Sequence, residues 1–329
     1  MSEFAEQIRI EELIRRCPDY ARIATLDTVE ANGHEFPIYS IEVGSEDPTV
    51  PVFGLFGGVH GLERVGTHVV LAYLESLFAQ AEWDHDLKTR FEQCRLVSIP
   101  LINPAGMFFG SRSNANGVDL MRNSPTKSEN ETPFLLGGHR YGPQLPWYMG
   151  PEEVSSEADM ELESRVLVEY VRKQCFQAKA CLTLDIHSGF GMKDRLWYPY
   201  AKTTAMFPRL PEVNNLDRLL DHTYPHHIYS VEPQSESYTT HGDLWDYLFD
   251  EHAALDPKRE RTFIPWTLEI GSWLWIRKNP RQLFSALGPF NPIKIHRHRR
   301  TMRRHLPLLD FFLRSVKHYS SWTTRRRGE

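Results

Sequence analysis

The sequence predicts a single α/β domain with a mixed, mostly parallel twisted sheet flanked by helices. Short apolar runs alternate with segments of helical periodicity along most of the chain, which favours strands joined by helices. Several runs are mostly apolar, as in strands that are buried on both faces. The 329 residues are 41% hydrophobic and show no internal repeat or linker, so one large core over residues 1–329 is expected.

The N-terminal part of the chain contains a helix, two strands, a second helix and a third strand. Cys17-Pro18 ends the first helix, and Asn32-Gly33 marks the turn before the first strand. After the second strand, apolar residues recur at helical spacing from Val65 to Leu77. The expected bounds are 3–16 (helix), 37–43 and 49–56 (strands), 65–77 (helix) and 95–102 (strand).

Residues 103–151 form the least regular region, rich in Gly, Pro, Ser and Asn. A loop of this length inside a compact domain is usually functional. Beyond it the alternation resumes with a helix that carries Ala158, Leu162, Val166 and Tyr170 at four-residue spacing. The remaining expected bounds are 180–186 and 262–270 (strands), 210–220 and 242–249 (helices) and 227–231 (extended).

The C-terminal segment is basic although the whole chain is acidic. Residues 291–329 hold 11 Lys or Arg and 2 Asp or Glu, whereas the full sequence has a net charge of −5. A basic tail can bind nucleic acid. We instead interpret it as the outer face of a helix over about 293–318 that docks on the domain, and we expect no nucleic-acid partner. Its docking stripe consists of Met302, Leu306, Leu309, Leu313 and Val316.

The sequence contains no signal for a membrane or for an oxidising compartment. No stretch approaches the roughly 20 apolar residues of a membrane span. Acidic residues stand near the start of the chain where a signal peptide carries cations. The four cysteines are too sparse for a disulfide framework. These features predict a cytoplasmic protein without a membrane partner, and they leave the oligomeric state open.

Potential metal ligands follow two of the expected strands, and a third strand carries a further carboxylate. His60 and Glu63 lie in a glycine-rich turn after the second strand, and His187 follows the strand 180–186. Two histidines and one carboxylate form an established zinc set that leaves a position open for catalysis. Glu269 is a carboxylate inside the otherwise apolar strand 262–270, where burial without a partner would be costly. It therefore faces a cation, a donor or the site, unless the strand lies at an edge of the sheet.

Several fragments resemble the zinc carboxypeptidase family (carboxypeptidase A type, funnelins), and they do so in the same order along most of the chain. Besides the turn from His60 to Glu63, these are Asn103-Pro104-Ala105-Gly106, Gly117-Val118-Asp119-Leu120-Met121-Arg122-Asn123, Tyr148-Met149-Gly150 with Ser156-Glu157, Asp185-Ile186-His187-Ser188, Tyr238 ahead of Gly242 and Asp246, and Thr267-Leu268-Glu269.

The resemblance implies one Zn²⁺ per chain, bound by His60, Glu63 and His187. It also implies that Glu269 is the general base of a peptide hydrolysis that uses a zinc-activated water. The other implied roles are Arg112 for the oxyanion, Arg122 for the terminal carboxylate of the substrate and Tyr238 for closing over the substrate.

Two positions depart from the family pattern. Met121 replaces an Asn beside Arg122, which removes an amide donor from the site expected to bind the carboxylate. Trp245 occupies a position that shapes the specificity pocket in the family, where an indole would narrow the pocket. The alternative for Trp245 is packing in the core.

Three functions remain open at this point. The first is a metallocarboxypeptidase that removes a C-terminal residue from a peptide. The second is a zinc-dependent amidohydrolase that deacylates small N-acyl amino acids, similar to the aspartoacylase and succinylglutamate desuccinylase branch. Met121 and the short spacing from the turn to Arg112 favour this alternative. The third is a binding module with a degenerate site, which the presence of every ligand type disfavours. We expect the metallocarboxypeptidase function.

Overall fold

The computed structural model describes residues 4–323 of the chain. Its centre is an eight-stranded sheet in the order β1-β2-β4-β3-β5-β8-β6-β7. The strands β4, β3, β5 and β8 run parallel, whereas β1, β2 and β6 pair antiparallel with a neighbour. The strands are β1 (Ala21–Ala31), β2 (His34–Gly44), β3 (Val52–Gly57), β4 (Arg95–Ile99), β5 (Ala180–Ser188), β6 (Arg195–Tyr198), β7 (Ser230–Pro233) and β8 (Thr262–Ile270).

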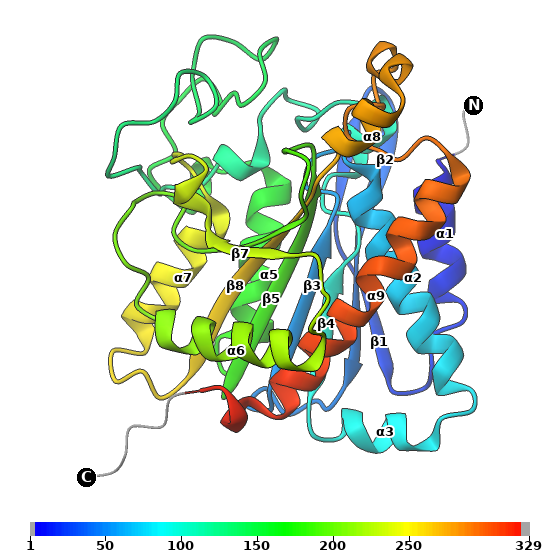
Figure 1. Cartoon of the computed structure of the whole chain (residues 1–329). Coiled ribbons are helices and arrows are strands. Elements are labelled where there is room, and N and C mark those ends of the chain that lie inside the picture. The colour runs from blue at the N-terminus through cyan, green and yellow to red at the C-terminus, as the bar shows by residue number, and fades with distance from the viewer. Residues whose placement is uncertain (1–3, 324–329) are drawn as a thin grey trace.

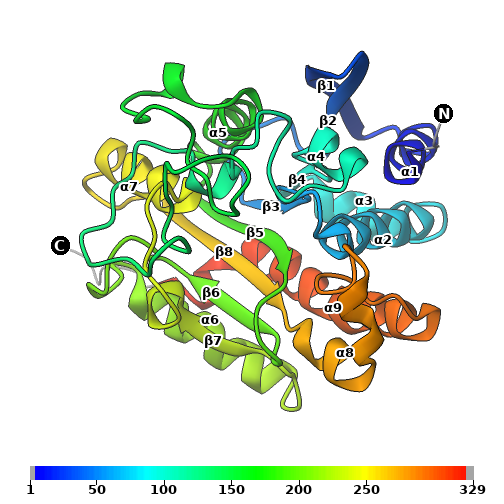
Figure 2. The ribbon, with the colours of Figure 1, turned by 90° about the horizontal axis from the view of Figure 1, so that it is seen from above.

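Helices cover both faces of the sheet, which crosses the molecule between them (Figure 1, Figure 2). Helices α2 and α9 pack together on one face, and α5 and α7 pack together on the other. The α-helices are α1 (Ala5–Ile14), α2 (Arg64–Ala81), α3 (His85–Phe91), α4 (Pro104–Phe109), α5 (Leu162–Cys175), α6 (Leu210–Thr223), α7 (Leu244–Leu255), α8 (Trp273–Lys278) and α9 (Ile295–Lys317). The predicted mixed, mostly parallel sheet flanked by helices is confirmed.

The central strands are apolar because both of their faces are covered. Every residue of β3 and of β5 is buried, as strands between two helix layers require. Since parallel strands end at the same edge of the sheet, the residues that follow β3 and those that end β5 and β8 come together. His187 and Glu269 are direct partners in the pairing of β5 with β8.

Two strands were not predicted, and both lie away from the parallel centre. Among residues 4–323 the strand β1 pairs only with β2, so one of its edges is free within this part of the chain. Its residues are mostly half-buried or exposed, and its sequence alternates weakly. The strand β6 has four residues and pairs with β7 and β8. The extended segment expected at 227–231 is β7 at Ser230–Pro233, and β4 ends at Ile99 rather than at residue 102.

The long helix α9 docks through a wider face than the predicted stripe. Leu309, Leu313 and Val316 are fully buried, but Leu306 is only half-buried. Leu308, Phe311 and Phe312 complete the buried face, while Arg299, Arg300 and Arg303 are exposed. The basic residues 325–327 of the expected tail lie outside the described residues. Among residues 4–323, no helix combines the length and apolarity needed to cross a membrane.

Candidate metal centre and active site

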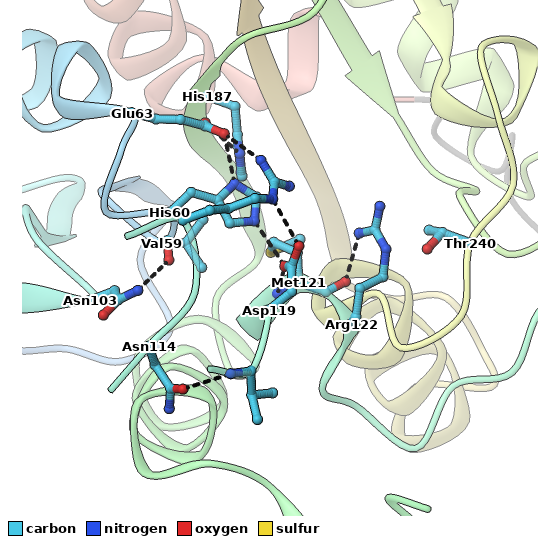
Figure 3. A network of polar contacts seen from close by, with 12 residues as sticks. Val59, His60, Glu63, Asn103, Asn114, Asp119, Met121, Arg122, His187 and Thr240 are labelled. Carbon is cyan, nitrogen blue, oxygen red and sulfur yellow. Dashed lines mark hydrogen bonds and ion pairs between the residues drawn. The ribbon is translucent and has the colours of Figure 1, made fainter. Parts of the chain in front are cut away.

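Three buried side chains meet at the carboxyl ends of β3 and β5. One ligand atom each of His60, Glu63 and His187 can be chosen so that these atoms lie within 4.8 Å of one another. The turn that carries His60 is compact because Gly61 packs against α4, where an added Cβ would lie 2.1 Å from the carbonyl carbon of Gly106. Figure 3 shows the three side chains converging, with Asp119 on the side of His60 away from Glu63.

Each histidine presents the same ring nitrogen to Glu63. His60 Nδ1 lies 2.9 Å from Glu63 Oε1, and His187 Nδ1 lies 3.2 Å from Glu63 Oε2. The opposite nitrogens are occupied, since His60 Nε2 is 2.9 Å from Asp119 Oδ1 and His187 Nε2 is 2.9 Å from Asp185 Oδ2. A proton on each Nε2 leaves a lone pair on each Nδ1, as in histidines that bind metal with a carboxylate behind them. The donor set therefore fits zinc.

Arg112 connects the two carboxylates on the His60 side of the site. It donates from Nη1 to Glu63 Oε1 at 2.9 Å and from Nε to Asp119 Oδ2 at 3.0 Å. Burial by itself would raise the pKa of Asp119, but Arg112 and His60 outweigh burial and hold this pKa well below its usual range. The Asp119 carboxylate can therefore accept a hydrogen bond from the Nε2–H group of His60.

Glu269 lies beside His187 at the end of β8 and is buried. Its Oε1 accepts a hydrogen bond from the backbone N–H of Phe190 at 2.9 Å. Burial, followed by the negative charge of Glu63, raises the pKa of Glu269 to about 8. A cation bound by the neighbouring ligands would act in the opposite direction and favour the carboxylate. This position suits a group that takes up and releases a proton beside a bound cation.

The three metal-ligand candidates and Glu269 line a cavity of about 130 Å³. Four further expected site residues line the same cavity, namely Arg112, Met121, Arg122 and Tyr238. Arg122 donates from Nη1 to the carbonyl of Met121 at 3.0 Å and from Nη2 and Nε to the carbonyl of Leu136 at 3.1 and 3.3 Å. The Tyr238 ring lies 6.0 Å from Arg122 Cζ. Every expected polar residue of the site is therefore at this cavity.

Trp245 is the one expected site residue that does not line the cavity. Its side chain is buried among core residues, with its ring centroid 5.3 Å from that of Phe56. Its indole N–H donates to Asp185 Oδ2 at 3.1 Å. The structure thus places Trp245 in the core behind His187, which was the alternative considered for this position.

Three aspartates near the site are functional candidates for which the sequence predicted no role. Asp119 and Asp185 support the two histidines, and Asp243 lines the cavity while its Oδ1 caps α7. Burial raises the pKa of Asp243. Asp185 precedes His187 by two positions in a strand, so both side chains lie on the same face. That spacing is a usable signal, whereas nothing local links Asp119 to His60.

The comparisons with known proteins point to one family. A family model described as zinc carboxypeptidase matches residues 9–257. The catalytic chain of carboxypeptidase N from Rattus norvegicus is 24% identical in an alignment of 216 residues that covers 59% of this chain and 44% of that protein. Carboxypeptidase SOL1 from Arabidopsis thaliana is 29% identical over 119 residues, which are 35% of this chain and 24% of that protein. The chain spans less than half the length of these relatives.

Solved structures share the fold. Thrombin activatable fibrinolysis inhibitor superimposes with a TM-score of 0.67 at 17% identity, over 94% of this chain and 72% of that chain. Carboxypeptidase A from Helicoverpa armigera superimposes with a TM-score of 0.61 at 17% identity, over 95% and 71% of the two chains. The match to the family model covers well over half of the sequence. Together with the His-Glu-His site, these findings show that the chain belongs to the zinc carboxypeptidase family.

Proposed function

We propose that this protein is a zinc metallocarboxypeptidase that hydrolyses the C-terminal peptide bond of a peptide. The observation that carries the proposal is the shared cavity, in which three metal-ligand candidates, a buried carboxylate and two arginines face one small volume. Peptide hydrolysis at a free C-terminus needs each of these groups within reach of one scissile bond.

His60, Glu63 and His187 would hold one Zn²⁺ per chain through two Nδ1 atoms and a carboxylate oxygen. When bound, zinc supplies a Lewis acid that polarises the scissile carbonyl and lowers the pKa of the attacking water. Asp119 and Asp185 keep the two rings in the required orientation by accepting hydrogen bonds from their Nε2–H groups.

Glu269 moves the proton in this proposal. Its Oε1 is held by the N–H of Phe190, and its Oε2 has no hydrogen-bond partner among residues 4–323. The Oε2 atom takes the proton of the attacking water and later delivers it to the departing amine nitrogen. Arg112 Nη2 is also without a partner among these residues, so it can donate to the negative charge that develops on the carbonyl oxygen.

Arg122 has the remaining donors that a terminal carboxylate requires. Its three bonds to backbone carbonyls leave one hydrogen on Nη1 and one on Nη2 for a further acceptor, and the Tyr238 hydroxyl is a polar neighbour of this guanidinium. Two parallel donors suit the two oxygens of a carboxylate. The neighbouring Met121 adds only an apolar wall, and Tyr238 lies where it can close over the bound residue.

The test is a substrate panel with the zinc-loaded full chain. It contains N-blocked dipeptides, the same dipeptides as C-terminal amides, and N-acetyl and N-succinyl amino acids. We expect cleavage of the free acids and none of the amides, loss of activity with a chelator, and recovery on adding zinc. Equal turnover of acids and amides would contradict the proposal. Turnover of acyl amino acids alone would replace it with the deacylase function.

A further inference from the structure

Trp245 is joined to the metal-ligand candidate His187 through a single carboxylate oxygen. Its indole N–H donates to Asp185 Oδ2 at 3.1 Å, and the same oxygen lies 2.9 Å from His187 Nε2. All three side chains are buried, with 3%, 0% and 5% of their residues' surface exposed for Trp245, Asp185 and His187. We propose that Trp245 is a positioning residue that fixes Asp185 and thereby aims His187 Nδ1 at the metal. This inference rests on the zinc site of the proposed function.

The indole matters because Asp185 has few other partners. Asp119, which supports His60, also accepts from Arg112 Nε and from the N–H of Met121. Asp185 receives its two side-chain contacts at Oδ2, and its Oδ1 is buried without a hydrogen-bond partner among residues 4–323. The indole is therefore the one described group, apart from His187 itself, that restrains this carboxylate. A buried carboxylate without a cation depends on such donors.

The fold fixes the direction of the indole N–H from two sides. At the backbone, Asp243 Oδ1 accepts from the N–H groups of Trp245 and Asp246 at 3.0 and 2.9 Å, which anchors the first turn of α7. At the ring, Phe56 of β3 packs against the indole at 5.3 Å between centroids. Trp245 thus reaches Asp185 from a rigid helix start, as a support for a metal ligand requires.

The inference separates metal binding from substrate preference. Loss of the Trp245 N–H should weaken zinc binding, because it releases Asp185 behind His187. The choice of substrate side chain should stay unchanged, because Trp245 does not line the cavity. Loss of a group that orients a zinc-bound histidine typically lowers metal affinity by about 10- to 100-fold.

The first experiment measures zinc affinity of the full chain by competition with a chromophoric chelator. Trp245→Phe keeps an aromatic ring against Phe56 and removes the N–H. We expect its dissociation constant for zinc to rise by about 10- to 100-fold. Trp266→Phe is the matched control, since Trp266 is also buried but its Nε1 has no hydrogen-bond partner among residues 4–323. Its zinc affinity should equal that of the wild type. Melting temperatures of both metal-free variants show whether the fold is intact.

A double-mutant cycle with Asp185→Ala tests the route of the effect. If Trp245 acts through Asp185, then Trp245→Phe should change zinc affinity in the wild-type background and have no effect in the Asp185→Ala background. Equal effects in both backgrounds, or a wild-type affinity in Trp245→Phe, would overturn the inference. Should Trp245→Phe fail to fold, replacement of Trp245 by benzothienylalanine, which keeps the bicyclic shape without an N–H, gives the same test.

The outcome also distinguishes this inference from the proposed zinc site. Zinc binding that survives His60→Ala combined with His187→Ala would refute the site itself. Zinc binding that depends on these histidines but not on the indole N–H would refute only the role of Trp245.

Discussion

At the scale of single residues, the two histidines of the site differ in what stands behind them. His60 is backed by Asp119, whose charge is balanced by Arg112. His187 is backed by Asp185, which has the Trp245 N–H as its other side-chain partner. Both arrangements fix which ring nitrogen faces Glu63. The His60 side therefore relies on an ion pair, and the His187 side relies on a neutral donor.

The first prediction concerns metal binding by these ligands. His60→Ala and His187→Ala should each lose zinc and activity together, because each removes one of the three protein ligands. Elemental analysis after dialysis measures the zinc content. Full zinc occupancy in the double variant would show that the ligands lie elsewhere.

The second prediction concerns the proton transfer at Glu269. Glu269→Gln keeps the size of the side chain and an oxygen for the Phe190 N–H, but it cannot take the proton of water. We expect kcat to fall by on the order of 10²–10⁴ while zinc content and melting temperature stay unchanged. Steady-state kinetics with a good substrate gives the answer. A kcat near that of the wild type would assign the base to another group.

At the scale of elements, α9 shows how a strongly basic segment becomes part of the core. Its arginines Arg299, Arg300 and Arg303 are exposed, while Leu309, Phe312 and Leu313 are buried against the sheet and α2. The helix is amphipathic with a broad apolar face, as in a helix that covers a sheet. Its charge therefore lies on the solvent side of a structural element.

The third prediction tests this docking. Leu309→Ala should lower the free energy of unfolding by about 2–5 kcal/mol, because it opens a cavity at a fully buried position. Arg303→Ala, on the exposed face of the same helix, should change it by less than about 0.5 kcal/mol. Urea unfolding of both variants measures the difference. Equal stabilities would mean that α9 contributes little to the fold.

At the scale of the whole molecule, buried neutral histidines make stability depend on pH. His252 in α7 and His305 in α9 are buried, and burial lowers the pKa of each to about 4. In the unfolded chain the pKa of histidine is about 6.5. Between these values the unfolded chain binds more protons than the folded one, so the free energy of unfolding falls as the pH falls.

The fourth prediction concerns this fall in the free energy of unfolding at acidic pH. Each of the two histidines should remove about 2 kcal/mol of stability between pH 6.5 and pH 5, and the loss should level off below about pH 4. His252→Leu removes one of these groups from a site beside Phe176 and Phe263. Urea unfolding at both pH values should show a smaller loss in the variant. An equal loss would place the pKa of His252 near its ordinary value. Carboxyl groups whose pKa is raised in the folded protein, such as Asp246, change the stability in the opposite direction as the pH falls. The informative quantity is therefore the difference in stability loss between the wild type and His252→Leu.

The sequence by itself determined the parts that depend on local pattern and on residue chemistry. The strands β3, β5 and β8 were predicted because burial on both faces makes a strand mostly apolar. His60, Glu63, His187 and Glu269 were found because metal binding and proton transfer restrict a position to a few residue types. The edge strand β1 was missed because Val29 is its one buried residue, and a strand with little burial on either face lacks a clear apolar pattern.

Tertiary structure decided which distant residues serve the site. Trp245 was expected either at the substrate pocket or in the core, and only the packing of α7 against β3 and β5 places its N–H on Asp185. Asp119 reaches His60 across 59 positions in sequence, so no periodicity links them. The physical reason is that residue type limits which bonds a side chain can form, whereas strand order and helix packing determine which partner lies within about 3 Å.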